Sequence, residues 1–121
     1  MPRVVHFEIN ADKPERASKF YGDLFGWKIN KWEGGDYWLV STGDKSQAGI
    51  DGGIMKRDGQ HASTYNTVAV ESLDEYLTKV TKLGGTIHRP KTQIPGIGWF
   101  AYCKDTEGNV FGIIQPDMPM K

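Results

Sequence analysis

The predicted secondary structure repeats itself after about half of the chain. A strand over 4–10 precedes a helix near 14–25 and three short strands, and the same order returns from residue 64 onward. A lone four-stranded sheet with one helix leaves a sheet face uncovered, so a repeat of this kind predicts two modules packed together. We expect an α+β fold in which two βαβββ modules, about 1–58 and about 61–117, form curved mixed sheets around a shared cleft within a single domain, 1–121.

The first predicted strand separates apolar from polar side chains by strict alternation. One face carries Val5, Phe7 and Ile9. The other face carries His6, Glu8 and Asn10. We expect the apolar face to pack on the helix and the polar face to line the cleft.

Each predicted helix opens with a capping box, at Asp12 with Glu15 and at Ser72 with Glu75. Each also carries one apolar stripe at helical spacing, which predicts a buried face. The stripes are Ala17, Phe20, Tyr21, Leu24 and Phe25, and Leu73, Tyr76, Leu77 and Val80.

Composition excludes several classes of partner. Fifteen basic residues balance fifteen acidic ones, so the chain lacks the positive charge that nucleic acids or anionic membranes require. The first residues do not resemble an export signal, and the single cysteine, Cys103, permits no internal disulfide. We therefore expect a cytoplasmic protein that binds neither nucleic acid nor membrane, and a buried, inert Cys103.

Four segments in the expected order carry a family resemblance. They are FYGDLFGW at 20–27, VAVESLD at 68–74, LGG at 83–85 and DTEGNVF at 105–111. With His6 near the start, they resemble the vicinal oxygen chelate superfamily of glyoxalases, ring-cleaving dioxygenases and bleomycin resistance proteins. The resemblance covers nearly the whole chain, and because relatives are often dimers it also implies a homodimer.

The same resemblance allows a test for a metal site. Metal-binding relatives use a His on the first strand, a carboxylate late in the first half, a His on the fifth strand and a Glu on the last. The corresponding positions here are His6, the glycine-rich region 51–53, Tyr65 and Gly112. One His with a Tyr and glycines falls short of a zinc or iron site, so we expect no metal and no other cofactor, as in the bleomycin-resistance-like members.

The leading interpretation is a metal-free protein that binds a small, partly aromatic or apolar molecule. The expected ligand-binding residues are His6, Glu8, Asn10, Tyr65, Trp99 and Phe100. His6 and Glu8 would orient the ligand, Tyr65 would donate a hydrogen bond or stack, and either Trp99 or Phe100 would form an apolar wall. Because side chains alternate along a strand, only one of Trp99 and Phe100 can face the cleft. We expect the segment 94–102 to form the rim or lid of the cleft.

An enzyme is the alternative, with the question of catalysis left open. It would be a divalent-metal-dependent lyase, isomerase or dioxygenase that uses His6 and Glu8 with further ligands that the sequence does not identify. The remaining histidines, His61 and His88, are interpreted as surface residues.

Overall fold

The α+β architecture is confirmed. The computed structural model describes residues 2–57 and 64–117, and these contain two helices and eight strands. They divide into two compact units, His6–Tyr65 and Asn66–Lys121 together with Met1–Val5. Neither described helix is long and apolar enough to cross a membrane. The shared cleft and the single domain stay predictions.

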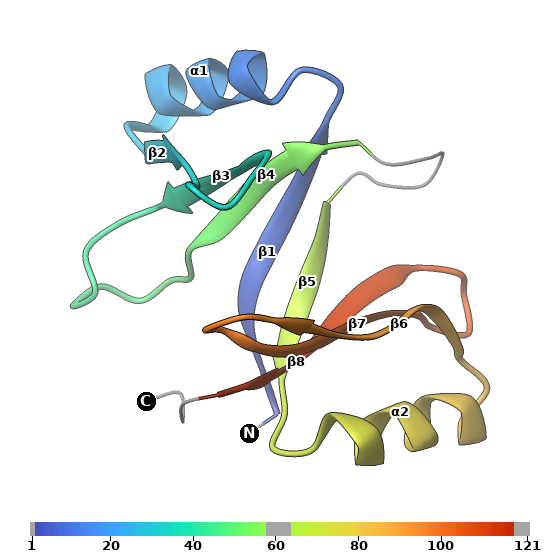
Figure 1. Cartoon of the computed structure of the whole chain (residues 1–121). Helices are drawn as coiled ribbons and strands as arrows, with labels where there is room; N and C mark the ends of the chain where they lie inside the picture. Colours follow the sequence, from blue (N-terminus) through green and yellow to red (C-terminus); the bar gives the residue numbers. More distant parts are fainter. Residues whose placement is uncertain (1, 58–63, 118–121) are drawn as a thin grey trace. The chain divides into compact units, whose positions relative to one another are not determined.

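The first unit is a mixed four-stranded sheet with one helix (Figure 1). Its elements are β1 (Arg3–Ala11), α1 (Pro14–Phe25), β2 (Lys28–Lys31), β3 (Tyr37–Ser41) and β4 (Gly52–Lys56). The strand order is β2-β3-β4-β1, in which β1 and β4 run parallel and the other neighbours antiparallel. Strand β4 starts at Gly52, and residues 48–51 before it are exposed and lie outside the sheet.

The second unit repeats this arrangement. Its elements are β5 (Thr64–Ala69), α2 (Leu73–Lys82), β6 (Thr86–Ile94), β7 (Gly98–Lys104) and β8 (Val110–Pro116). The order is β5-β8-β7-β6, with β5 parallel to β8 and the other neighbours antiparallel. Ile94 pairs directly with Gly98, so the start of the predicted lid is a tight hairpin turn and the rest is strand.

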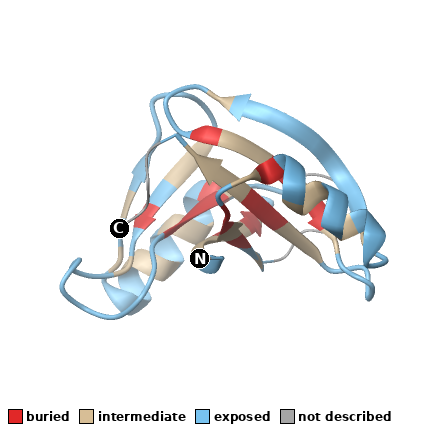
Figure 2. Ribbon diagram, turned by 90° about the horizontal axis from the view of Figure 1, so that it is seen from below, coloured by how far each residue is buried: buried red, intermediate tan, exposed pale blue. Residues whose placement is uncertain are grey.

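Helix α2 covers the core of the second unit, as its apolar stripe predicts. The buried cluster is Val70, Leu73, Ala101, Cys103 and Ile113, and α2 adds Tyr76, Leu77 and Val80. Figure 2 shows such buried segments in red. Cys103 is fully buried, which confirms the expected buried thiol, and burial raises its pKa.

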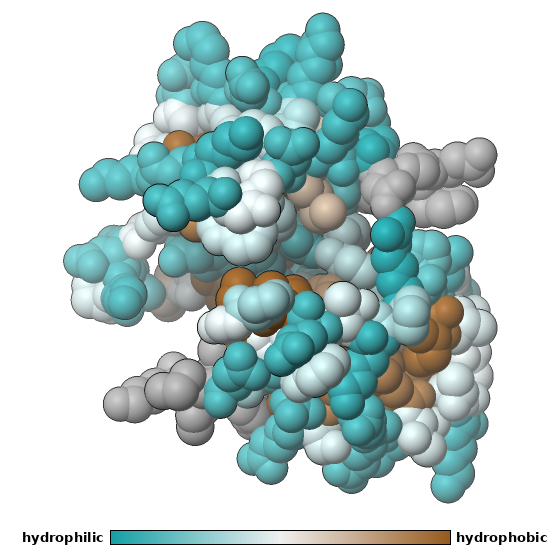
Figure 3. Space-filling view, viewed as in Figure 1, coloured by the Kyte–Doolittle hydropathy of each residue, from teal (hydrophilic) through white to brown (hydrophobic). Residues whose placement is uncertain are grey.

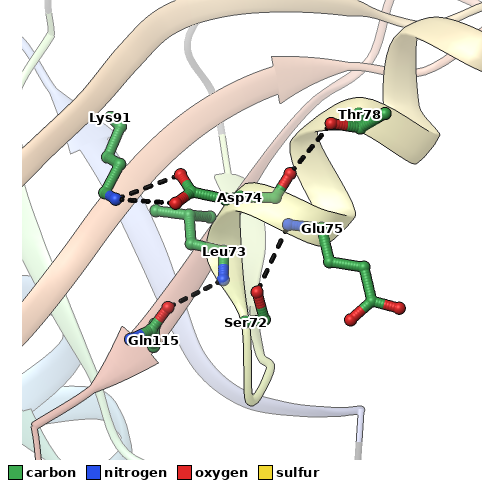
Figure 4. A network of polar contacts seen from close by, with 7 residues as sticks. All are labelled: Ser72, Leu73, Asp74, Glu75, Thr78, Lys91 and Gln115. Carbon is green, nitrogen blue, oxygen red and sulfur yellow. Dashed lines mark hydrogen bonds and ion pairs between the residues drawn. The ribbon is translucent and has the colours of Figure 1, made fainter.

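The start of α2 is fixed by side chains from two directions (Figure 4). The Ser72 hydroxyl accepts a hydrogen bond from the Glu75 backbone N–H at 3.3 Å, which confirms the predicted N-cap. The Leu73 N–H donates to the side chain of Gln115 on β8 at 2.8 Å, and Lys91 of β6 binds Asp74 at 3.0 Å. Helix α2 is thereby tied to its own sheet.

Helix α1 begins differently from the prediction. Its N-cap residue is Lys13, which makes no side-chain cap, and Pro14 opens the helix. Asp12, the expected cap, instead accepts hydrogen bonds from Arg57 at 3.2 Å. A long-range ion pair has therefore replaced the local cap.

The apolar stripe of α1 is not core, contrary to the prediction. Phe20, Leu24 and Phe25 are 59%, 56% and 58% exposed, and Pro14 is the one buried residue of the helix. Aromatic rings pack on one another instead: the ring centroids of Tyr21 and Trp27 lie 5.4 Å apart, and those of Phe25 and Trp27 lie 5.1 Å apart. Most of the surface seen in Figure 3 is hydrophilic.

Candidate functional site

The polar face of β1 is deeply buried. Glu8 and Asn10 are each 5% exposed and His6 is half-buried, whereas the first two residues of the strand are exposed. Acidic and amide side chains are seldom buried to this extent, and when they are they need hydrogen-bond partners. This face is therefore the first candidate for a site.

Tyr37 supplies the partner. Its hydroxyl lies 2.6 Å from Nε2 of His6, and it also hydrogen-bonds the side chain of Glu8. Tyr37 opens β3, and β3 and β1 flank β4 from opposite sides. The three residues, called the polar cluster below, thus come from two strands that flank β4.

Burial and charge set the protonation of the polar cluster. Burial lowers the pKa of His6, although the negative charges of Glu8 and Asp51 act in the opposite direction. Burial and the adjacent charge and hydrogen bond of Glu8 raise the pKa of Tyr37 far above its ordinary value. At neutral pH the cluster therefore combines a neutral imidazole with a protonated phenol.

A glycine makes room for the ring of Tyr37. Gly53 of β4 pairs in register with Glu8, and a Cβ at this glycine would coincide with the ring and hydroxyl of Tyr37. Any side chain here would push Tyr37 away from His6. Gly53 is consequently part of the site although it carries no functional group.

Tyr65 lies at the edge of the same unit. Its hydroxyl contacts the sulfur of Met55 at 3.7 Å, and Met55 pairs in register with both Tyr37 and Asn10. By contacts, Tyr65 is therefore grouped with His6, Glu8 and Asn10, although the rest of β5 belongs to the second unit.

The other two expected residues lie on β7, where alternation separates them. Trp99 packs against the buried core of the second unit, with the Lys91 ammonium 4.7 Å from its ring centre. Phe100 lies on the opposite face, over Gly112 of β8. Their roles as ligand contacts stay predictions. His88 is exposed, as expected, and His61 lies outside the described residues.

The second βαβββ repeat contains a counterpart of the polar cluster that is built from different side chains. Three pairs of residues have the same separation in sequence as the first residues of the two helices. They are His6 and Tyr65, Glu8 and Thr67, and Gly53 and Gly112. Thr67 pairs with Gly112 as Glu8 pairs with Gly53.

The ring over each glycine also corresponds. Tyr37 pairs with the residue two positions after Gly53, and Phe100 pairs with the residue two positions after Gly112. Phe100 has no hydroxyl, and the buried Thr67 Oγ1 has no hydrogen-bond partner among the residues that the structure describes. The second repeat therefore keeps a ring over the glycine and has the hydroxyl side chains of Tyr65 and Thr67 in place of His6 and Glu8.

Comparisons with known proteins agree with this architecture. Residues 3–43 match a family model described as bleomycin resistance protein-like N-terminal. CFP32 of Mycobacterium tuberculosis and Mycobacterium bovis, a protein provisionally named as a glyoxylase, is 29% identical over 112 residues, which are 90% of this chain and 42% of that protein. The chain thus spans less than half the length of these curated relatives.

Solved structures show the same fold over nearly the whole chain. A methylmalonyl-CoA epimerase variant from Streptomyces coelicolor, solved with 2-nitronate-propionyl-CoA, has a TM-score of 0.70 at 10% identity and covers 100% of this chain and 99% of its own. A glyoxalase/bleomycin resistance protein/dioxygenase superfamily member from Vibrio splendidus has a TM-score of 0.65 at 12% identity, covering 93% and 97%. The chain is therefore similar in fold to members of this superfamily.

The residues present do not fit the metal site of metal-binding superfamily members. The resemblance puts Gly112 and the region 51–53 at the two carboxylate positions, and the rings of Tyr37 and Phe100 fill the space that a side chain at Gly53 or Gly112 would need. The described residues contain no group of three His, Cys, Asp or Glu side chains suited to a metal ion. The hydroxyl of Tyr37 also engages both groups that could ligate, His6 Nε2 and Glu8.

Tyr37 is the site residue that sequence reasoning missed. Its partner His6 is 31 positions away in the sequence. The repeat contained the signal, because Phe100 was a candidate and Tyr37 is its counterpart in the first module. Aligning the two halves strand by strand would have found it.

Proposed function

We propose that this chain binds a small organic molecule without a metal, on the sheet face of the first unit that carries the polar cluster. The single observation behind the proposal is the Tyr37 hydroxyl between His6 and Glu8. A linked, buried polar group of this kind orients a ligand at little entropic cost, because its own side chains are already held.

Apolar surface flanks the polar cluster and supports an organic ligand. Leu39 pairs in register with Gly53 and is 47% exposed, and Met55 and Tyr65 are half-buried. A ligand that placed an aromatic or aliphatic group on these side chains would gain hydrophobic contact, and one polar atom would reach the cluster. Asn10 and Tyr65 would assist from the edges.

A ligand screen with matched variants tests this proposal. We expect aromatic metabolites to raise the melting temperature of the wild type, since a ligand at about a hundred times its dissociation constant adds roughly 2.7 kcal/mol. His6→Ala and Tyr65→Ala should reduce the affinity for the same compound. His88→Ala, which removes an exposed histidine from β6, is the control. Unchanged affinity in both site variants would reject the assignment.

The metal-dependent alternative has one observation in its favour: His6 and Glu8 lie on one face of β1. Elemental analysis of protein purified without chelators separates the two functions. About one equivalent of zinc, nickel, iron or manganese per chain would contradict the metal-free proposal.

Two further parts of the proposal concern the whole protein. We place it in the cytoplasm, where a reducing environment suits a chain whose single cysteine is buried. We also propose a homodimer, which size-exclusion chromatography with light scattering would test directly. A mass of one chain at micromolar concentration would contradict it.

A further inference from the structure

The hydroxyl of Tyr37 has only one proton to share between two neighbours. A carboxylate accepts hydrogen bonds and has none to donate. The bond between Tyr37 and Glu8 therefore uses the phenolic proton, with Glu8 as the acceptor. The oxygen of Tyr37 is then left as an acceptor toward His6, 2.6 Å away, and Nε2 of His6 must carry the donating proton.

We propose that Tyr37 determines the ligand class of this site by holding His6 in the tautomer protonated on Nε2. In that tautomer Nδ1 offers a lone pair and no proton. The site then takes a ligand group that donates a hydrogen bond, such as a hydroxyl or an amide N–H, and disfavours a carboxylate in the same place. This inference rests on the proposed function, and Tyr37 is a positioning residue in it.

Two features of the surroundings support this ligand class. Among residues 2–57 and 64–117, Nδ1 of His6 has no hydrogen-bond partner, so the lone pair is available. The charged groups that act on His6 electrostatically are both carboxylates, Glu8 and Asp51. A second acceptor with a negative charge would meet repulsion from both.

The fit around Tyr37 explains why this arrangement holds one geometry. The hydroxyl end of the Tyr37 ring lies against the backbone of β4 at Gly53, where a Cβ would overlap it. Its plane is 14° from that of His6, with ring centroids 6.4 Å apart. A rigid phenol at a fixed distance can select one tautomer, whereas a mobile hydroxyl would serve either.

Nitrogen-15 NMR of the imidazole rings in the free protein tests the role of Tyr37. We expect His6 in the wild type to show a protonated Nε2 and a bare Nδ1, with His6→Gln identifying its signals. Tyr37→Phe keeps the ring and removes the hydroxyl, and His6 should then become a mixture of tautomers. Tyr76→Phe, on α2 in the other unit, should leave the signals unchanged. A proton on Nδ1 in the wild type would overturn the inference.

A matched pair of probes, benzamide and benzoate, tests the ligand class. The two have the same shape, but the first donates N–H bonds and the second is an anionic acceptor. We expect benzamide to bind the wild type about tenfold more tightly, which corresponds to about 1.4 kcal/mol, and this preference should shrink in Tyr37→Phe. Equal affinity of the wild type for the two probes, or tighter binding of benzoate, would overturn the inferred ligand class.

The two layers of the proposal fail in different ways. If benzamide binds His6→Ala as well as the wild type, the ligand lies elsewhere and the proposed function is wrong. If neither probe binds while His6 keeps its Nε2 proton, the ligand class and the proposed face are both contradicted, and the effect of Tyr37 on the tautomer stands. If His6 carries its proton on Nδ1, Tyr37 does not have this role, whatever binds.

Discussion

Phe100 lies over Gly112, with its ring atom Cζ 2.6 Å from the point that a Cβ on the glycine would occupy. Tyr37 and Gly53 repeat this relationship in the other half of the chain. The two halves have therefore kept one packing device, a ring from the third strand lying on a glycine of the fourth. Only in the first half does this ring carry a hydroxyl, and there the hydroxyl hydrogen-bonds His6.

Gly112→Ala should lower the free energy of unfolding by about 1–3 kcal/mol, the usual cost of forcing a methyl group into a filled space. The added carbon would meet Phe100 Cζ at 2.6 Å and Thr67 Oγ1 at 2.9 Å. Urea denaturation measures the change. Gly22→Ala is the control, because its Cβ meets nothing closer than 3.5 Å and lies on a helix. It should keep the stability or raise it by about 0.4–1 kcal/mol. Equal stability of both variants would refute the packing argument.

Thr67→Val should raise the free energy of unfolding by about 1 kcal/mol. Thr67 is 2% exposed, and its hydroxyl has no partner within the described part of the chain, so the folded state bears a desolvation cost that valine removes. Chemical denaturation at pH 7 measures this change in the free energy of unfolding. Thr78→Val is the control, since that exposed hydroxyl donates to the Asp74 carbonyl at 3.1 Å. A loss of stability in Thr67→Val would mean that the hydroxyl has a partner in solution.

Sequence patterns predicted most of the architecture because they report local preferences. Alternation in β1 separated His6, Glu8 and Asn10 from the apolar face, and Ser72 capped α2 as its spacing indicated. The N-cap at Asp12 failed because Arg57, distant in sequence, binds that carboxylate. Local patterns contain no information about such a competitor.

The candidate site was only half predictable for the same reason. His6 and Glu8 follow from strand parity, but Tyr37 reaches them through the register of β3 and β4, which the sequence leaves open. The role of Gly53 was equally unpredictable, because the sequence does not distinguish a glycine that packs against a ring from any other glycine in a strand. The helical stripe of α1 shows a third limit: periodicity identifies an apolar face without saying whether anything covers it.

Phe20→Ala should change the free energy of unfolding by less than about 1 kcal/mol, although the sequence pattern places this residue in a core. The side chain is 59% exposed, so its truncation returns little buried surface to water. Ile54→Ala is the comparison, at a fully buried position of β4, and should cost about 2–5 kcal/mol. Thermal and urea unfolding of both variants measure the two losses in the free energy of unfolding. A large loss in Phe20→Ala would show that the α1 face is covered in the protein in solution.

The stability that His6 contributes should decline as the pH falls. Burial lowers the pKa of His6 in the folded state, whereas an unfolded histidine titrates near ~6.5. Below about pH 6.5 the unfolded chain therefore binds a proton that the folded protein resists, and the free energy of unfolding drops. The difference between the wild type and His6→Gln should be largest at about pH 7–8 and shrink toward pH 5, as measured by urea denaturation. His88→Gln controls for the loss of an exposed imidazole. A difference that grows in acid would mean that Glu8 and Asp51 outweigh burial, so that the folded protein binds the proton more tightly than the unfolded chain.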